Sequence, residues 1–76
     1  MDCYRTLNYT KPGETVTISR ILSEKHIRQR LLDLGFVDGT SIKCVLKQRN
    51  GEIAAYLVRG TTIALRKEDA QRIVVF

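Results

Sequence analysis

Short stretches of alternating apolar and polar residues, separated by turn residues, run along most of the chain. Val16 and Ile18 alternate with threonine and serine, and this β-branched pattern predicts a strand from Thr15 to about Leu22. The preceding segment, Lys11-Pro12-Gly13-Glu14, fits a type II turn. Proline fixes φ at the second position of such a turn, and glycine accepts the positive φ of the third.

The period changes between residues 24 and 34, where apolar side chains recur at the spacing of a helix. Ile27, Leu31 and Leu34 follow the i, i+4, i+7 pattern, so a helix over these residues would bury one apolar stripe. We expect Ser23 to cap the first turn of this helix. Gly35 is expected to end it in the left-handed conformation that glycine adopts at little cost.

Leu32 lies off the predicted apolar stripe, between the basic residues Lys25 and Arg28. Two interpretations are open. Leu32 either packs under the neighbouring loop, near Phe36 or Val37, or forms an exposed apolar contact with a basic rim. The second arrangement is typical of a protein-binding surface.

The pair Asn50-Gly51 favours a two-residue type I′ turn that joins the alternating runs 40–48 and 53–59 in a hairpin. The register that this turn sets places Cys44 opposite Leu57 and Leu46 opposite Ala55 on the core face. The outer face would then be basic with one aromatic ring, and its residues are Lys43, Lys47 and Tyr56.

Gly60 permits a further reversal into a strand over residues 61–66, followed by a short helical turn over 67–72 and a last strand over 73–76. The sequence thus predicts a mainly β protein of about five short strands. One α-helix follows the first strand, and the helical turn precedes the last. We expect a compact β-barrel, since closure removes the exposed edges that an open sheet would leave.

The chain has 76 residues, with 13 lysines and arginines against 8 acidic residues, which gives a net charge of +5. We interpret residues 1–76 as one domain, because a chain of this length buries only about 60% of its unfolded surface and leaves little room for a deep active site. Its longest apolar run, Ile53 to Val58, is too short to span a bilayer, and the polar start of the chain lacks a signal-like stretch. Cys3 and Cys44 form no paired motif, so a reducing cytoplasm is the expected location.

No residue pattern matches a catalytic or cofactor site. Ser23, His26 and Asp33 share the predicted helix region, but helix geometry directs Asp33 along the axis, away from a nucleophile. The single histidine and the two separated cysteines lack the spacing of zinc ligands, and the glycines match no phosphate-binding loop. We therefore expect no enzyme activity, no metal site and no cofactor, and function is left to the surfaces.

Four segments are informative in combination: Lys11-Pro12-Gly13, residues 28–35 followed by Asp38-Gly39, the pair Arg59-Gly60, and the run Ile63 to Ala70. With these segments the chain resembles the FeoA family, the small cytosolic proteins associated with bacterial ferrous-iron uptake. The resemblance covers nearly the whole chain and implies an SH3-like barrel. A related domain ends some metal-dependent repressors, and the start at Met1 favours the free-standing form.

The resemblance also implies an accessory protein that binds the cytosolic GTP-binding part of FeoB, the membrane ferrous-iron transporter, without entering the membrane itself. On the residues, we expect Arg28, Leu32 and Arg66, with Lys25 at the rim, to contact this partner. Arginine pairs with acidic groups, and a nearby leucine adds desolvated area.

Two further functions are open. Small β-barrels offer basic and aromatic faces to nucleic acids, and Lys43, Lys47 and Tyr56 would form such a face here. The basic residues form no continuous stripe, however, so nucleic acid is the less favoured partner. Direct carriage of iron is the third hypothesis, and it predicts stoichiometric binding of ferrous ion in a calorimetric titration.

Overall fold

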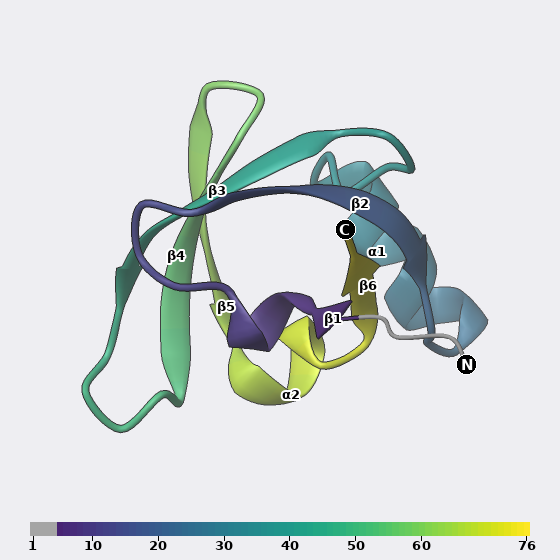
Figure 1. Cartoon of the computed structure of the whole chain (residues 1–76). Coiled ribbons are helices and arrows are strands. Elements are labelled where there is room, and N and C mark those ends of the chain that lie inside the picture. Colours follow the sequence, from purple (N-terminus) through teal and green to yellow (C-terminus); the bar gives the residue numbers. More distant parts are fainter. Residues whose placement is uncertain (1–4) are drawn as a thin grey trace.

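The chain forms a six-stranded antiparallel sheet with the strand order β1-β6-β2-β3-β4-β5 (Figure 1). A computed structural model describes residues 5–76, and Cys3 and the rest of the polar start lie outside them. The elements in chain order are β1 (Arg5–Thr6), the 3-10 helix η1 (Leu7–Tyr9), β2 (Thr15–Ile21), α1 (Lys25–Asp33), β3 (Ser41–Lys47), β4 (Ile53–Val58), β5 (Thr61–Arg66), α2 (Lys67–Ala70) and β6 (Ile73–Val75). The predicted mainly β fold is confirmed, with one helix after β2 and a short one before the last strand. The structure adds β1, which is too short to produce a hydrophobic pattern.

β2 belongs to both halves of the sheet and curves the sheet around the core. Its first residues pair with β3, and its last residues pair with β6. Between these two parts the register shifts, because Ile18 pairs with Val75 and Arg20 with Val74. An extra residue in one strand bends that strand and increases its twist. Figure 1 accordingly shows β2 arching across the molecule.

One hydrophobic core lies inside this curved sheet, with side chains from strands, η1 and α1. A domain of this size depends strongly on such a core, since it has little other buried surface. The largest fully buried side chains are Tyr56, Phe36, Leu7, Ile18, Ile42 and Ile73.

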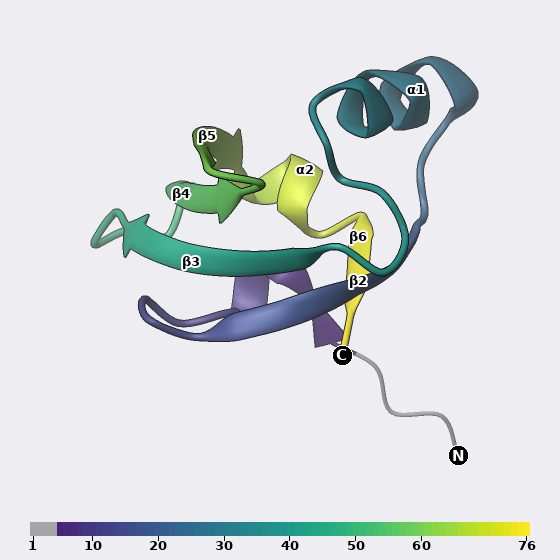
Figure 2. The same ribbon diagram turned by 90° about the horizontal axis from the view of Figure 1, so that it is seen from above.

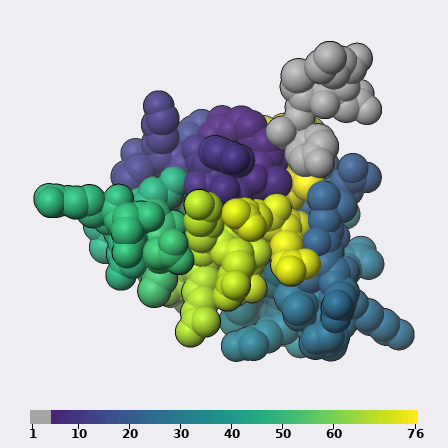
Figure 3. Space-filling model, turned by 90° about the horizontal axis from the view of Figure 1, so that it is seen from below, coloured from purple at the N-terminus to yellow at the C-terminus, as the bar shows by residue number. Residues whose placement is uncertain are grey.

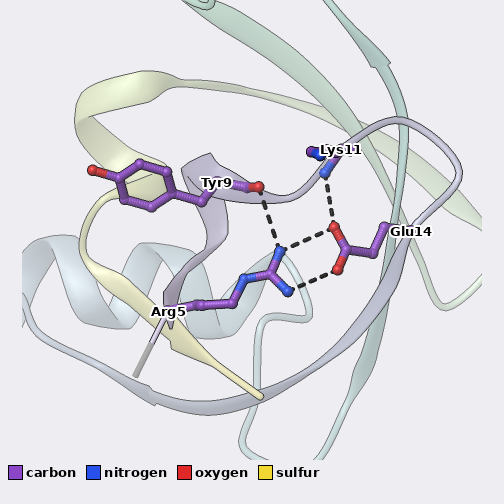
Figure 4. A network of polar contacts seen from close by, with 4 residues as sticks. All are labelled: Arg5, Tyr9, Lys11 and Glu14. Carbon is purple, nitrogen blue, oxygen red and sulfur yellow. Dashed lines mark hydrogen bonds and ion pairs between the residues drawn. The ribbon is translucent and has the colours of Figure 1, made fainter. Parts of the chain in front are cut away.

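The turn before β2 matches the prediction from Pro12 and Gly13. Gly13 has a φ of 91°, and the Glu14 N–H donates to the Lys11 carbonyl at 2.9 Å, as a type II turn requires. The Glu14 carboxylate then accepts two hydrogen bonds from the Arg5 guanidinium, at 2.7 and 2.9 Å, and a third from the Lys11 N–H at 3.0 Å (Figure 4). This ion pair ties β1 to the turn. The hydrogen bonds from Arg5, followed by that from Lys11, lower the pKa of Glu14 to about 2.

Replacing Glu14 by glutamine is expected to lower the thermal unfolding midpoint at pH 7, because a neutral amide cannot accept both guanidinium bonds as a carboxylate does. The folded-state pKa lies below the usual carboxyl value, so the carboxylate stabilises the fold above about pH 4 and this stabilisation is lost as the pH falls toward 2. Thermal scans of both proteins at pH 7 and near pH 2 test this. A midpoint difference of equal size at the two pH values would contradict the charge-based explanation.

The end of α1 also agrees with the prediction from the sequence. Gly35 has a φ of 106°, its N–H donates to the Leu32 carbonyl at 3.0 Å, and the Phe36 N–H donates to the Leu31 carbonyl at 3.1 Å. These two bonds define a Schellman motif, which places Phe36 directly over the last turn of the helix. The helix is one residue shorter at each end than predicted.

The predicted cap at the start of α1 is wrong. Glu24 occupies the N-cap position, and its side chain makes no capping hydrogen bond. The Ser23 hydroxyl is buried, and within the described part of the chain it has no hydrogen-bond partner. Ser23 lies one residue too early for its oxygen to reach the first free N–H groups of the helix.

The β3–β4 turn differs from the predicted type I′ turn. Such a turn needs positive φ at both central residues, and among non-glycine residues in 5–76 only Arg59 has positive φ. The Asn50 side chain instead accepts a hydrogen bond from the Glu52 N–H at 3.0 Å, within the five-residue loop over 48–52. The type I′ pattern occurs one hairpin later, where Arg59 and Gly60 have φ values of 51° and 82°.

The predicted hairpin register is correct next to the turn and wrong beyond it. Leu46 pairs with Ala55 as expected, but a bulge at Val45 shifts the next pair to Cys44 with Tyr56. The shift turns Tyr56 into the core, where it is 1% exposed and its hydroxyl donates to the Leu7 carbonyl at 3.5 Å. Burial raises the pKa of Tyr56 to about 12. One inserted residue thus exchanges the two faces of β4.

Candidate functional site

A groove lies between α1 and the end of β5, and five of its eight lining residues are apolar. It encloses about 320 Å³. Figure 2 shows α1 standing off from the β4–β5 hairpin, with α2 between them. The apolar walls of the groove are formed by Ile27, Leu31 and Leu34 from α1, and by Ala64 and Leu65 from β5.

The helix wall of this groove consists of the apolar stripe that the sequence predicts, but the stripe is only partly covered. Leu31 is buried and Ile27 is partly buried against the core. Leu34 is 43% exposed, because it follows the last helical residue and lies in the capping turn instead of over the core. An exposed leucine in a concave surface is a natural contact for a partner protein.

Three charged residues line the groove: Arg30, Arg66 and Asp69. Arg66 comes within 3.8 Å of the Glu68 carboxylate, and both side chains are at least 70% exposed, so this pair holds Arg66 only weakly. The lining itself is positive, with two guanidinium groups against one carboxylate, and Glu68 just outside it offsets part of the charge of Arg66. The groove therefore suits an acidic partner surface.

The structure brings only one of the predicted partner-binding residues to this groove. Arg66 lines it, whereas Lys25 and Arg28 are exposed on α1 outside it. Leu32 is partly buried and packs against the core cluster, to which Phe36 belongs. Sequence reasoning missed Arg30 and the exposure of Leu34. Their i, i+4 spacing, which places both on one helix face, was the available signal.

Replacing Leu32 by aspartate is expected to lower the free energy of unfolding by about 1–3 kcal/mol, because it places a charge against the core. Replacing Leu34 by aspartate is expected to lower this free energy by less than the Leu32 substitution does, since Leu34 is 43% exposed and does not pack against the core cluster. Urea unfolding of both variants measures the contrast. Equal effects of the two substitutions would mean that the groove wall is misassigned.

The predicted basic outer face of the hairpin does not exist as a unit. Tyr56 is in the core, and the Lys47 ammonium donates to the Asn8 carbonyl at 2.8 Å on the inner side. Lys43 is exposed, but its cross-strand neighbour on the outer face is Leu57. The outer face instead carries exposed apolar residues, of which Leu46 is 67% exposed. The aromatic platform on which nucleic-acid binding was based is therefore absent from this face.

A second hollow, of about 430 Å³, lies on the other side of Arg66, where the β3–β4 hairpin meets α2. Figure 3 shows these two segments side by side, in green and yellow-green, on the lower face. The hollow is lined by charges of both signs, including Glu52, Lys67 and Glu68, with Ile53 as its apolar residue. Because Ile53 is the one apolar side chain of its lining, this hollow offers a partner fewer apolar contacts than the groove and is the weaker binding candidate.

Within residues 5–76 no three His, Cys, Asp or Glu side chains come together as metal ligands would. Cys44 is buried, and burial raises the pKa of its thiol. His26 lies 3.7 Å from the Glu24 carboxylate on the exposed start of α1. No helix in this part of the chain has the length and apolar character of a membrane span.

Comparison with protein families gives a match to the FeoA domain over residues 5–75. No curated protein sequence matches the chain. Among solved structures, a FeoA-like protein from Clostridium acetobutylicum is 32% identical with a TM-score of 0.87, and the match covers 100% of this chain and 88% of that one.

FeoA from Stenotrophomonas maltophilia, solved in complex with zinc, is 30% identical with a TM-score of 0.84, over 95% of this chain and 89% of that one. That protein is described as a prokaryotic SH3 domain protein and a candidate activating factor for ferrous iron transport. A manganese-dependent transcriptional repressor shares the fold at 19% identity with a TM-score of 0.85, over 100% of this chain and 42% of that one. The expected SH3-like architecture is confirmed by these matches.

Proposed function

Because the chain belongs to the FeoA domain family, we propose that it binds the cytosolic GTP-binding part of a FeoB-type ferrous iron transporter and modulates its activity. A FeoA domain is a non-catalytic accessory domain linked to ferrous iron transport. Such a domain acts through a contact surface, and the chemistry belongs to its partner. The proposed place of action is the cytoplasm.

The α1–β5 groove is the observation that supports this proposal. Leu34 offers apolar area to a partner, and Arg66 and Arg30 lie beside it. An apolar contact with charged residues at its edge is the usual composition of a protein-binding site. We infer that Leu34 and Arg66 make the main contacts.

Lys25 and Arg28 have a lesser role in this proposal. Both are exposed on α1 outside the groove, and they add to the positive charge of the chain, which is +5 overall. Charges at this distance from the contact accelerate the encounter with an acidic partner more than they hold the complex together. Their contribution should therefore decrease as the salt concentration rises.

Titration of the intact transporter in nanodiscs with this protein tests the proposal, in the absence of nucleotide and with GDP or a GTP analogue. The expected result is saturable one-to-one binding with an affinity on the order of micromolar, as is typical of a small regulatory interface. The isolated cytosolic domain should bind equally well if it holds the whole site. Absence of binding in every nucleotide state would refute the proposed function.

Two control titrations separate this function from the alternatives. Ferrous ion added to the protein alone should give no stoichiometric heat, and a stoichiometric signal would favour iron carriage. Single-stranded DNA or RNA should not bind at low salt, where phosphate contacts are strongest. Tight, salt-sensitive binding would favour a nucleic-acid function.

A further inference from the structure

β5 is an open edge of the sheet. It is the last strand in the strand order, and within residues 5–76 only β4 pairs with it. The strand at the opposite edge, β1, has two residues, whereas β5 has six. The register of β5 with β4 is continuous, and its sequence contains no proline. It therefore lacks the bulge and the proline that commonly protect edge strands from pairing with other chains.

The hydrogen-bonding pattern determines which backbone groups of β5 are free. At one end of the ladder, the Lys67 N–H donates to the Glu52 carbonyl at 2.8 Å. Hydrogen-bonded and non-hydrogen-bonded pairs alternate in an antiparallel ladder, so Ala64, which pairs with Ala55, occupies a non-hydrogen-bonded position. Thr62, two residues earlier, occupies another. The N–H and C=O groups of Ala64 and Thr62 therefore point away from β4.

The apolar groove lies along this free edge. Ala64 forms part of one wall, and Ile27 and Leu34 of α1 form part of the other. A strand added to β5 would direct alternate side chains to each face, and α1 provides apolar contacts beside the new strand.

The charges around the edge are mainly positive. Arg30 and Arg66 line the groove, and Asp69 is its one carboxylate. In the turn of the β4–β5 hairpin, Arg59 lies close to the end of α1. Its Cδ is 3.9 Å from the position that a Cβ atom would occupy if Gly35 had a side chain. Two guanidinium groups thus line the groove, and the third arginine, Arg59, lies outside the lining near the end of α1. They favour an acidic occupant over a neutral or basic one.

We propose that β5 receives an extended acidic segment of the partner protein as a seventh strand. The Ala64 and Thr62 backbone groups would bond to the segment, its apolar side chains would pack against α1, and its carboxylates would pair with the arginines. The proposal rests on the proposed function, since it takes the segment to belong to the cytosolic part of the FeoB-type transporter. It adds the binding mode, which is strand addition at the β5 edge.

The test uses Ala64→Pro with Ala64→Ser as its matched control. Proline removes the outward N–H, and an edge strand tolerates proline where that N–H faces solvent. Serine alters the side chain and keeps the N–H. Titration of the intact transporter in nanodiscs is expected to give at least about tenfold weaker binding for Ala64→Pro than for Ala64→Ser, which is the loss of one buried backbone hydrogen bond.

Wild-type binding by a folded Ala64→Pro variant would overturn strand addition and leave the proposed function intact. No binding by the unchanged protein would overturn both. Amide exchange of the unchanged protein is a second test that needs no variant: the Ala64 and Thr62 N–H groups should become protected when the transporter is added. Unaltered exchange at both positions in a formed complex would refute the binding mode even if Ala64→Pro failed to fold.

A second copy of this chain is the competing occupant of the edge. Sedimentation of the protein at increasing concentration is expected to give a monomer. A dimer that Ala64→Pro abolishes and Ala64→Ser retains would assign the edge to self-association, and would contradict its assignment to an acidic partner segment.

Discussion

Replacing Phe36 by alanine is expected to lower the free energy of unfolding by about 3–5 kcal/mol. The Phe36 side chain is fully buried in the core, and its backbone N–H completes the Schellman motif at the end of α1. Truncation leaves a cavity that the surrounding residues fill only in part. A domain of this size is stable by an amount near the lower end of about 5–15 kcal/mol, so the variant should be extensively unfolded at 37 °C.

Phe76 provides a matched control, because it is the other phenylalanine of the chain and is 78% exposed. Phe76→Ala keeps the backbone bonds between Phe76 and Thr17, and should change the free energy by less than about 0.5 kcal/mol. Urea unfolding followed by circular dichroism measures both variants. If the two truncations had similar effects, the core would not be centred where the structure places it.

Replacing Leu34 by aspartate is expected to weaken binding to the FeoB-type transporter at least about thirtyfold, the effect of losing one central contact residue. The substitution removes the exposed apolar side chain of the groove. It also introduces a negative charge where the positive rim favours an acidic partner, so repulsion adds to the loss of contact. Titration against the transporter in nanodiscs measures the change.

Leu46→Asp is the control for this result, since Leu46 is an even more exposed leucine on the outer face of the β3–β4 hairpin. It makes the same change in charge and hydrophobicity outside the groove, and should alter the affinity less than about threefold. The reverse outcome, with Leu46→Asp weakening binding and Leu34→Asp leaving it unchanged, would move the contact surface to the hairpin face.

For the candidate site, the sequence allowed a prediction of the residue types but not of which leucine lines the groove. The sequence indicates a partner-binding surface with arginines and a leucine on the helix, and it includes Arg66, which lines the groove. Leu32 was chosen over Leu34 because helical periodicity assumes that the stripe faces the core along its whole length. In the structure the helix ends before Leu34, and the capping turn leaves that side chain in the groove.

The sequence by itself determined the order of the elements and the turns that depend on local backbone conformation. Gly35 ends α1 and Gly13 forms the turn before β2, since both need a positive φ that glycine alone accepts readily. These preferences involve neighbours a few residues apart, so they can be recognised without knowledge of the rest of the fold.

Only the tertiary structure decided which face of β4 is buried and where the groove between α1 and β5 lies. The bulge at Val45 places Tyr56 in the core, where its hydroxyl reaches the Leu7 carbonyl, 49 residues away in sequence. The free edge of β5 and the position of α1 beside it likewise depend on how distant segments pack. Burial and edge exposure are properties of the whole sheet, and for that reason no local pattern could specify them.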